Sequence, residues 1–370
     1  MSGAASMLAT FLVTLLVHAT VAASISLALG RLVLHEPYQR ELLWKATLIL
    51  PLVTSLCATT FFPAALRLNV DAESVTGILR AFSPVPLPGT TVLVTVTRTA
   101  GRSVVFERVS DPIAPFVSFA ILLATIVPAT VATWRLARSR SRFRMKMRSR
   151  QPIAAEALGV PAALMRLKRG ETARISVSPA ISGAVALGTN EVCLSTDSVV
   201  RLMPAERLAV VAHEVAHLER RDSRWLFFAD VAAAVLVSQP MIGAIARRLR
   251  HDAEFICDDS AARRTGDRLA YVRALAALAA THDSAVPTLT FAHSSSLLLR
   301  RAKRVLSSPP LARRQQVFLP VAIVAMLVVL LMLVPPVRVG PVLARAYSHQ
   351  GGGANMSQRS EATRIVLTAK

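Results

Sequence analysis

The sequence predicts a mainly α-helical membrane protein, with four transmembrane helices and an α+β domain inserted between the third and the fourth. Apolar residues make up 53% of the 370 residues and the mean hydropathy is +0.48, values seldom found in soluble domains. Such a chain is too apolar to be disordered, and three cysteines are too few for a disulfide scaffold. The longest segment between apolar runs, residues 138–316, is large enough for a domain with its own core.

Four apolar runs are long enough to cross the hydrocarbon core of a bilayer, which takes about 20 residues. They lie at residues 7–34, 46–66, 113–137 and 317–335. No basic residue precedes the first run, which favours a transmembrane helix over a cleaved signal peptide. Residues 1–137, with three spans, therefore form the predicted N-terminal membrane region.

The positive charge of the chain also fits a membrane protein. The formal net charge is +21, which on its own would equally suggest nucleic-acid binding. However, residues 135–150 hold eight basic residues and no acidic one, directly after the third apolar run. Such clusters set membrane orientation and bind anionic headgroups, so we expect the lipid bilayer as partner and no direct nucleic-acid binding. This orientation makes residues 138–316 cytoplasmic, and both termini and the loop 67–112 extracytoplasmic.

Smaller elements are predicted outside the apolar runs. Partial alternation over residues 90–109 indicates a hairpin in the outer loop. Residues 182–195 indicate a strand pair, which is either a structural hairpin or an edge on which a substrate peptide can add as a strand. The tail 336–370 has no clear periodicity and is expected to be mostly flexible. The cysteines are far apart and are expected to be buried small residues rather than redox or metal groups: Cys57, Cys193 and Cys257.

One motif predicts a metal site. Residues 213–217 read His-Glu-Val-Ala-His, in a segment that begins with Pro204 and has apolar residues at helical spacing. Because four residues make about one helical turn, His213 and His217 project from one face and can hold one zinc ion. Glu214 lies beside that position and can take a proton from the attacking water. The alternative is a surface helix with two exposed histidines.

A catalytic zinc site of this kind needs a third protein ligand. Glu254 and Asp258 are one helical turn apart, so Glu254 can bind the metal while Asp258 accepts a hydrogen bond from a ligand histidine, most readily His213. His251 and Asp252 are lower-ranked alternatives for the third ligand, because neither gives this pairing. A solvated acidic face among arginines is the structural alternative.

Two neighbouring segments bear on this site. Residues 225–246 are apolar enough to resemble a further span, but a full crossing would separate Glu254 from His217 by about 30 Å. We therefore expect a helix packed in the domain, or a hairpin that dips into the near leaflet and turns around Gln239-Pro240. The residues just past the histidine helix are expected to cap and orient its end: Arg220, Arg221 and Asp222.

These motifs resemble those of the BlaR/MecR-type membrane metallopeptidases, the signal transducers of inducible beta-lactam resistance, which share a gluzincin-type core with the HtpX and CAAX prenyl protease group. The matching segments are HEVAHLERRD (213–222), SQP (238–240), RRLRHDAEFICDD (247–259), TGDRLAYVRALAAL (265–278) and LLLRRAKRVLS (297–307). Three spans, a cytoplasmic zinc domain and a fourth span are also that family's topology. The resemblance implies location in a bacterial cell membrane.

The resemblance also implies roles for individual residues. His213, His217 and Glu254 would bind one Zn²⁺, Glu214 would be the catalytic base, and Asp258 would hold a ligand histidine. The residue that stabilises the tetrahedral intermediate is not assigned, and the candidates are His251, His282 and His293.

The implied function is zinc-dependent hydrolysis of a protein substrate at the cytoplasmic face, in signal transduction by cleavage of a transcriptional repressor or of the peptidase itself. The alternatives are an HtpX-like quality-control protease and a catalytically silent membrane-anchored regulator. The departure from the family is the tail, because residues 336–370 contain no Ser-x-x-Lys and cannot build a penicillin-binding domain. Beta-lactam binding is therefore not expected.

Overall fold

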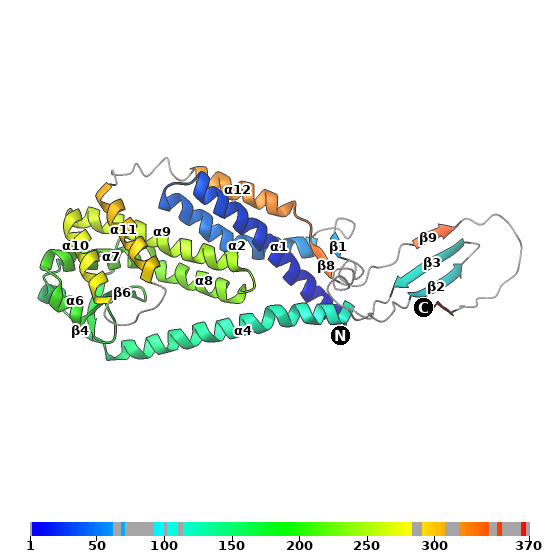
Figure 1. Ribbon diagram of the computed structural model, residues 1–370, viewed down its shortest axis with the longest axis horizontal. Helices are drawn as coiled ribbons and strands as arrows, with labels where there is room; N and C mark the ends of the chain where they lie inside the picture. The colour runs from blue at the N-terminus through cyan, green and yellow to red at the C-terminus, as the bar shows by residue number, and fades with distance from the viewer. Residues whose placement is uncertain are drawn as a thin grey trace, which may run out of the picture. The chain divides into compact units, whose positions relative to one another are not determined.

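The computed structural model describes the helical regions of the chain and several strands (Figure 1). The described residues are 2–61, 68–70, 92–99, 102–109, 114–282, 291–307, 318–339, 346–349 and 364–367. They form two compact units, one built from residues 1–19, 51–127 and 329–370 and the other from residues 20–50 and 128–328. Four long helices contribute to both units: α1 (Ser2–Leu32), α2 (Pro37–Phe61), α4 (Ala114–Lys146) and α12 (Phe318–Met332).

Three of the described helices are long and apolar enough to cross a membrane. Their candidate spans are Met7–Leu32, Pro37–Phe61 and Phe119–Ser149, which correspond to the first three predicted runs. Helix α4 continues beyond the predicted end at residue 137 because arginine and lysine are good helix formers and their charge suits a helix C-terminus. Helix α12 has 15 residues, about 22 Å at 1.5 Å per residue, so a fourth crossing stays a prediction.

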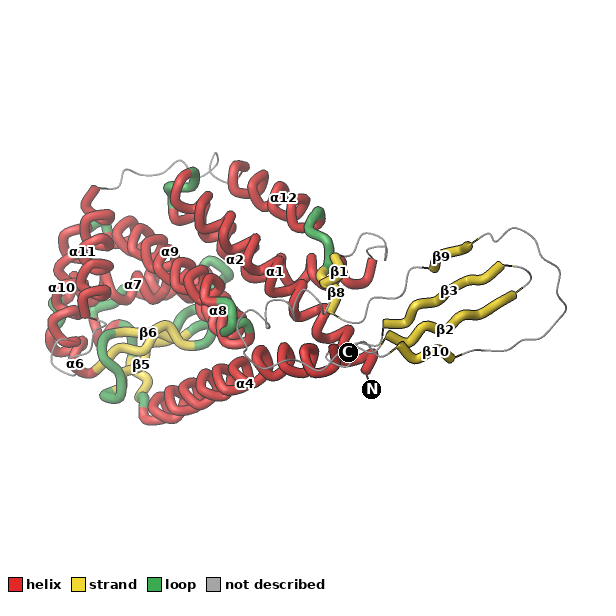
Figure 2. Tube along the Cα trace, turned by 45° about the vertical axis from the view of Figure 1, so that its right-hand side comes forward, coloured by secondary structure: helices red, strands yellow, loops and turns green. Residues whose placement is uncertain are grey.

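The first unit carries a sheet outside the helices. Strand β2 (Val92–Thr99) pairs antiparallel with β3 (Arg102–Val109), which confirms the predicted hairpin. The tail, predicted to be mostly flexible, adds β10 (Arg364–Leu367) and β9 (Ala346–His349) to the two edges of this hairpin (Figure 2). It also contributes β8 (Val337–Val339), which pairs with β1 (Leu68–Val70). These strands were not predicted because they are short and find partners far away in the sequence.

The second unit contains a small mixed sheet in the order β4-β5-β7-β6. The strands are β4 (Gln151–Ile153), β5 (Arg174–Ser178), β6 (Ala184–Leu187) and β7 (Glu191–Ser195). Strands β6 and β7 form the strand pair predicted over residues 182–195. The helices that follow are α6 (Thr196–Arg201), α7 (Pro204–Arg220), α8 (Asp222–Val235), α9 (Pro240–Thr265), α10 (Arg268–His282) and α11 (Phe291–Ser307).

Helix α7 lies at the centre of this unit. It begins with Pro204 at its first turn, as predicted, and Glu206 accepts a hydrogen bond from the backbone N–H of Met203 at 3.0 Å. One face of the helix packs on the sheet through a cluster that includes Val211, Val215 and Leu218. The opposite face places small residues against α9, α10 and α11: Ala209 and Ala212 pack with Ala261, Tyr271, Leu275 and Val305. A helix buried on both sides holds its side chains in fixed positions.

A left-handed residue ends α7 and starts the next helix. Arg221 has φ 57°, the one positive φ among described residues other than glycine, and the chain continues directly into α8 at Asp222. Helices α8 and α9 form an antiparallel hairpin that turns just before Pro240, and they lie side by side in both views (Figures 1 and 2). Residues 225–246 therefore form a helical hairpin that turns at Gln239-Pro240, as one of the two predictions had it, whereas the predicted dip into the near leaflet stays a prediction.

The hairpin and α2 both contact α1. The tip of the hairpin reaches α1 where Gln239 hydrogen bonds to Thr20. Gly30 allows α1 and α2 to approach closely, because a Cβ at this position would clash with the ring of Trp44. Trp44 also donates to Asp252 on α9, so this segment of α2 is bonded to the helix that carries Glu254.

Candidate metal centre

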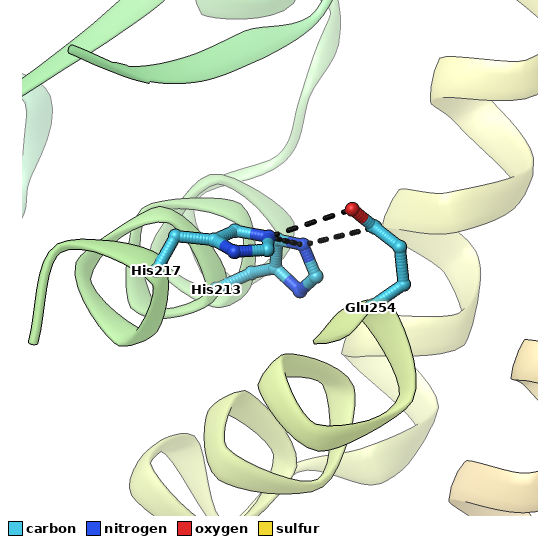
Figure 3. A group of neighbouring side chains, drawn as sticks. All are labelled: His213, His217 and Glu254. Atoms are coloured by element: carbon cyan, nitrogen blue, oxygen red, sulfur yellow. Dashed lines mark hydrogen bonds and ion pairs between the residues drawn. The ribbon is translucent and has the colours of Figure 1, made fainter. Parts of the chain in front are cut away.

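Three side chains from two helices converge on one point (Figure 3). Helix α7 supplies His213 and His217, whose Nε2 atoms are 3.1 Å apart. Helix α9 supplies Glu254, whose carboxylate oxygens lie 3.4 Å from Nε2 of His213 and 3.5 Å from Nε2 of His217. Ligands 2.0–2.1 Å from a tetrahedral zinc ion are about 3.3 Å from one another. The donor set and its spacing therefore fit a zinc ion.

Each histidine is held by a carboxylate at its other ring nitrogen. Nδ1 of His217 lies 2.9 Å from Oδ2 of Asp222, and Nδ1 of His213 lies 3.1 Å from Oδ1 of Asp258. A hydrogen bond donated by Nδ1–H fixes the tautomer in which Nε2 carries the free lone pair. Both Nε2 atoms face Glu254 and are the ring nitrogens that a metal would bind.

Tyr271 completes the surroundings of His213. Its hydroxyl lies 2.8 Å from Nδ1 of His213 and hydrogen bonds to Asp258. Burial and the neighbouring Asp258 carboxylate raise the pKa of Tyr271 well above its ordinary value, so the hydroxyl stays protonated and donates to that carboxylate. The ring of His213 is thus fixed from two sides.

Arg301 joins the third ligand to this network. Its Nε and Nη2 donate to Asp258 at 2.8 and 2.7 Å, and its Nη1 lies 3.1 Å from Oε2 of Glu254. Burial alone would raise the pKa of Glu254, but its surroundings, which include the Arg301 guanidinium, hold that pKa well below its usual range. Glu254 is therefore ionised and oriented, as a metal ligand must be.

Cys257 belongs to a second group that could hold a metal, together with His217 and Asp222. Its Sγ lies 3.4 Å from Nδ1 of His217 and 3.4 Å from Oδ2 of Asp222. Burial raises the pKa of the Cys257 thiol to about 11, and thiolate is the form that binds metals. Since His217 already uses Nδ1 to bond Asp222, this second group fits a metal less well than the first.

The structure also places the other predicted residues. Glu214 follows His213 on α7 and is 8% exposed. Asp252, an alternative third ligand, is bound instead by Trp44 at 2.7 Å and by Arg40. His251 is half-buried on α9, and the side chains of His282 and His293 lie outside the described residues.

Three residues of the site were not predicted for their roles. Asp222 was expected only to cap a helix end, yet it follows His217 by five residues and its carboxylate reaches the ring because Arg221 turns the chain. Tyr271 and Arg301 lie within segments quoted for the family resemblance, but nothing in their spacing indicates the contact with His213 or Glu254.

A His–His–Glu group with both histidines buried, in a chain with three candidate membrane spans, is typical of membrane-associated metallopeptidases. Comparison with protein families identifies the family within this class. The family described as BlaR1 peptidase M56 matches residues 11–304, and the chain belongs to it. A search of curated proteins finds no match for this chain. The matched range begins in α1 and ends in α11, so it includes His213, His217 and Glu254.

Proposed function

We propose that this protein is a membrane-embedded zinc endopeptidase of the gluzincin type. His213, His217 and Glu254 would hold one zinc ion, and Glu214 would be the catalytic base. The observation that carries the proposal is the convergence of two imidazole Nε2 atoms, 3.1 Å apart, on a carboxylate whose oxygens lie 3.4 and 3.5 Å from them, with both histidines held at Nδ1 by carboxylates. Zinc in such a site supplies Lewis acidity for peptide hydrolysis.

Other residues near the site have proposed roles in proton transfer, in ligand orientation and in charge balance. Glu214 would take a proton from the attacking water and pass it to the leaving amine, because in this motif the residue after the first histidine is expected to lie beside the metal without binding it. Asp222 and Asp258 keep the imidazoles in the right tautomer and orientation. Arg301 balances the negative charge of Glu254 and Asp258 inside the protein.

The substrate of this peptidase is proposed to be a protein segment in extended conformation. Strand β6 forms one edge of the four-stranded sheet and packs next to α7. A peptide that pairs with this edge adds a strand through main-chain hydrogen bonds and lies beside the helix that carries the motif. We infer that the protein cleaved is a cytoplasmic transcriptional repressor or the peptidase itself, as the family suggests.

The orientation of the protein is also proposed. The basic cluster at 135–150 supports a cytoplasmic location for residues 138–316 in a bacterial cell membrane, with both termini outside. A reporter that works only outside the cytoplasm is therefore expected to be active when it is fused at Gly352, and one that works only in the cytoplasm is expected to be inactive there. Activity of the cytoplasmic reporter at Gly352 would contradict the proposed topology.

Metal content measured together with cleavage tests the proposed function. The full-length protein is purified in detergent beside Glu214→Gln and Glu254→Ala, zinc is quantified, and cleavage of the protein itself and of any transcriptional repressor encoded by a neighbouring gene is followed. Wild type is expected to hold one zinc and to cut, Glu214→Gln to hold zinc without cutting, and Glu254→Ala to lose zinc. Wild-type protein without zinc would refute the zinc peptidase. Cleavage of unfolded membrane proteins, with the repressor left intact, would instead support the HtpX-like alternative.

A further inference from the structure

A chain of hydrogen bonds leads from α2 to one of the histidines. Oε1 of Glu41, in the second turn of α2, lies 2.8 Å from Nη2 of Arg220. Nε of Arg220 donates to Oδ2 of Asp222 at 3.0 Å, and the same oxygen lies 2.9 Å from Nδ1 of His217. Three contacts therefore connect a residue of a candidate membrane span to an atom on the ring of a metal-ligating side chain.

All four side chains are shielded from water. Their exposed fractions are 11% for Glu41, 20% for Arg220, 3% for Asp222 and 10% for His217. Electrostatic interactions in such surroundings are stronger than in water, and an unpaired charge there is unfavourable. Each member of the chain therefore depends on its neighbours for its position.

Arg220 divides its guanidinium between two carboxylates. Burial alone would lower the pKa of Arg220, but Asp222 and Glu41 together outweigh this and raise it. If Glu41 loses its charge, the guanidinium is balanced by Asp222 alone and binds that carboxylate more strongly. Because Arg220 and His217 share the same oxygen of Asp222, the hydrogen bond that orients His217 then weakens.

We propose that Glu41 is a positioning residue for the metal ligand His217, acting through Arg220 and Asp222. The inference rests on the proposed zinc site. It adds that the site is completed by a segment of the membrane region, so that a displacement of the start of α2 changes how firmly zinc is held. A movement of α2 in the membrane region would therefore change zinc affinity through Arg220 and Asp222.

The chain offers a matched control for this proposal. Glu36, just before α2, makes an ion pair of the same kind with Arg304 at 3.0 Å, and Arg304 in turn lies 3.1 Å from Asp259. Asp222 bonds a ligand histidine, whereas Asp259 pairs with Arg304. Glu36→Gln therefore removes an arginine ion pair between the same segment and the domain, without a route to a metal ligand; Glu41 differs in being less exposed and in pairing with Lys45 at 2.6 Å as well.

The test compares zinc affinity in the full-length protein in lipid nanodiscs, measured by competition with a zinc chelator. Loss of a direct partner of a ligand histidine reduces metal affinity by about 10–100-fold, so the indirect Glu41→Gln is expected to reduce it by about 3–10-fold. Glu36→Gln is expected to stay within about 2-fold of wild type, on the same reasoning. The melting temperatures of the metal-free variants show whether either substitution simply damages the fold.

A double substitution separates positioning from a general structural role. If Glu41 acts through Asp222, then Glu41→Gln has no further effect on zinc affinity in an Asp222→Asn background. Independent, additive effects in the double variant would overturn the proposal, as would equal affinities for Glu41→Gln and Glu36→Gln. Absence of zinc binding by wild type would instead refute the proposed function on which the inference rests.

Discussion

Oδ2 of Asp222 lies 2.9 Å from Nδ1 of His217, although the two residues belong to different helices. The contact forms because Arg221, at φ 57°, turns the chain between α7 and α8. An aspartate at the start of α8 is thereby in hydrogen-bond distance of a histidine near the end of α7. It makes the motif residue His217 dependent on a residue outside the motif.

Asp222→Asn tests this dependence. The amide keeps the size of the side chain but removes its negative charge, so we expect zinc affinity to fall by about 10–100-fold. Chelator competition on the full-length protein measures the change. The control is Asp259→Asn. Asp259 is also a buried aspartate that pairs with an arginine, Arg304. If both variants bind zinc as wild type does, Asp222 does not orient His217.

Arg301→Met tests the charge balance of the site without its metal. Arg301 is the cation shared by Glu254 and Asp258, and its removal leaves the buried Asp258 and the partly buried Glu254 without that partner. We expect the metal-free protein to lose about 3–5 kcal/mol of unfolding free energy. Thermal unfolding in the presence of a chelator measures the loss. Arg300→Met, at an exposed neighbouring position, should unfold like wild type, and an equal loss in both variants would argue against this role for Arg301.

The outline of the fold and the metal-ligating motif could be predicted because their signals are local. Apolar length indicates three membrane helices, Pro204 with helical spacing indicates α7, and four-residue spacing puts His213 and His217 on one face. Alternation likewise indicated the hairpins β2–β3 and β6–β7. Each of these features is determined within about 30 residues of sequence.

The remaining parts depend on contacts between distant segments. The tail strands pair with the outer hairpin, and Arg301 meets Glu254 from a helix that begins far along the chain. Glu41 and Arg220 are separated by 179 residues. Charged residues of this kind look like ordinary surface residues in the sequence, and only packing brings their charges together.

Gly30→Ala tests the close approach of α1 and α2. The added Cβ would clash with the ring of Trp44, whose Nε1 donates to Asp252. The ring has to move, so we expect a loss of about 1–3 kcal/mol in unfolding free energy, typical of overpacked interiors. Thermal unfolding of the full-length protein measures it. Gly243→Ala is the control because a Cβ there meets only the end of Arg247 at 3.8 Å, and equal melting of the two variants would contradict the close packing at Gly30.

Glu191→Gln tests how the segment after α4 is attached to the sheet. Arg150 donates to both oxygens of Glu191, at 2.6 and 3.1 Å, and Ser176 donates at 2.7 Å. The hydrogen bond from Arg150 lowers the pKa of Glu191 from its ordinary value of 4.5, although partial burial acts in the opposite direction.

Because the folded-state pKa of Glu191 lies below the unfolded one, its contribution to stability is present above about pH 4.5 and is lost as the pH falls through the folded-state value. Glu191→Gln should therefore melt below wild type at pH 7, and the difference should shrink as the pH is lowered from 5 toward 3. Melting curves of both proteins across this range measure the effect, with Glu171→Gln as a control at an exposed ion pair. A difference that stays constant with pH would show that the charge of Glu191 contributes nothing to this attachment.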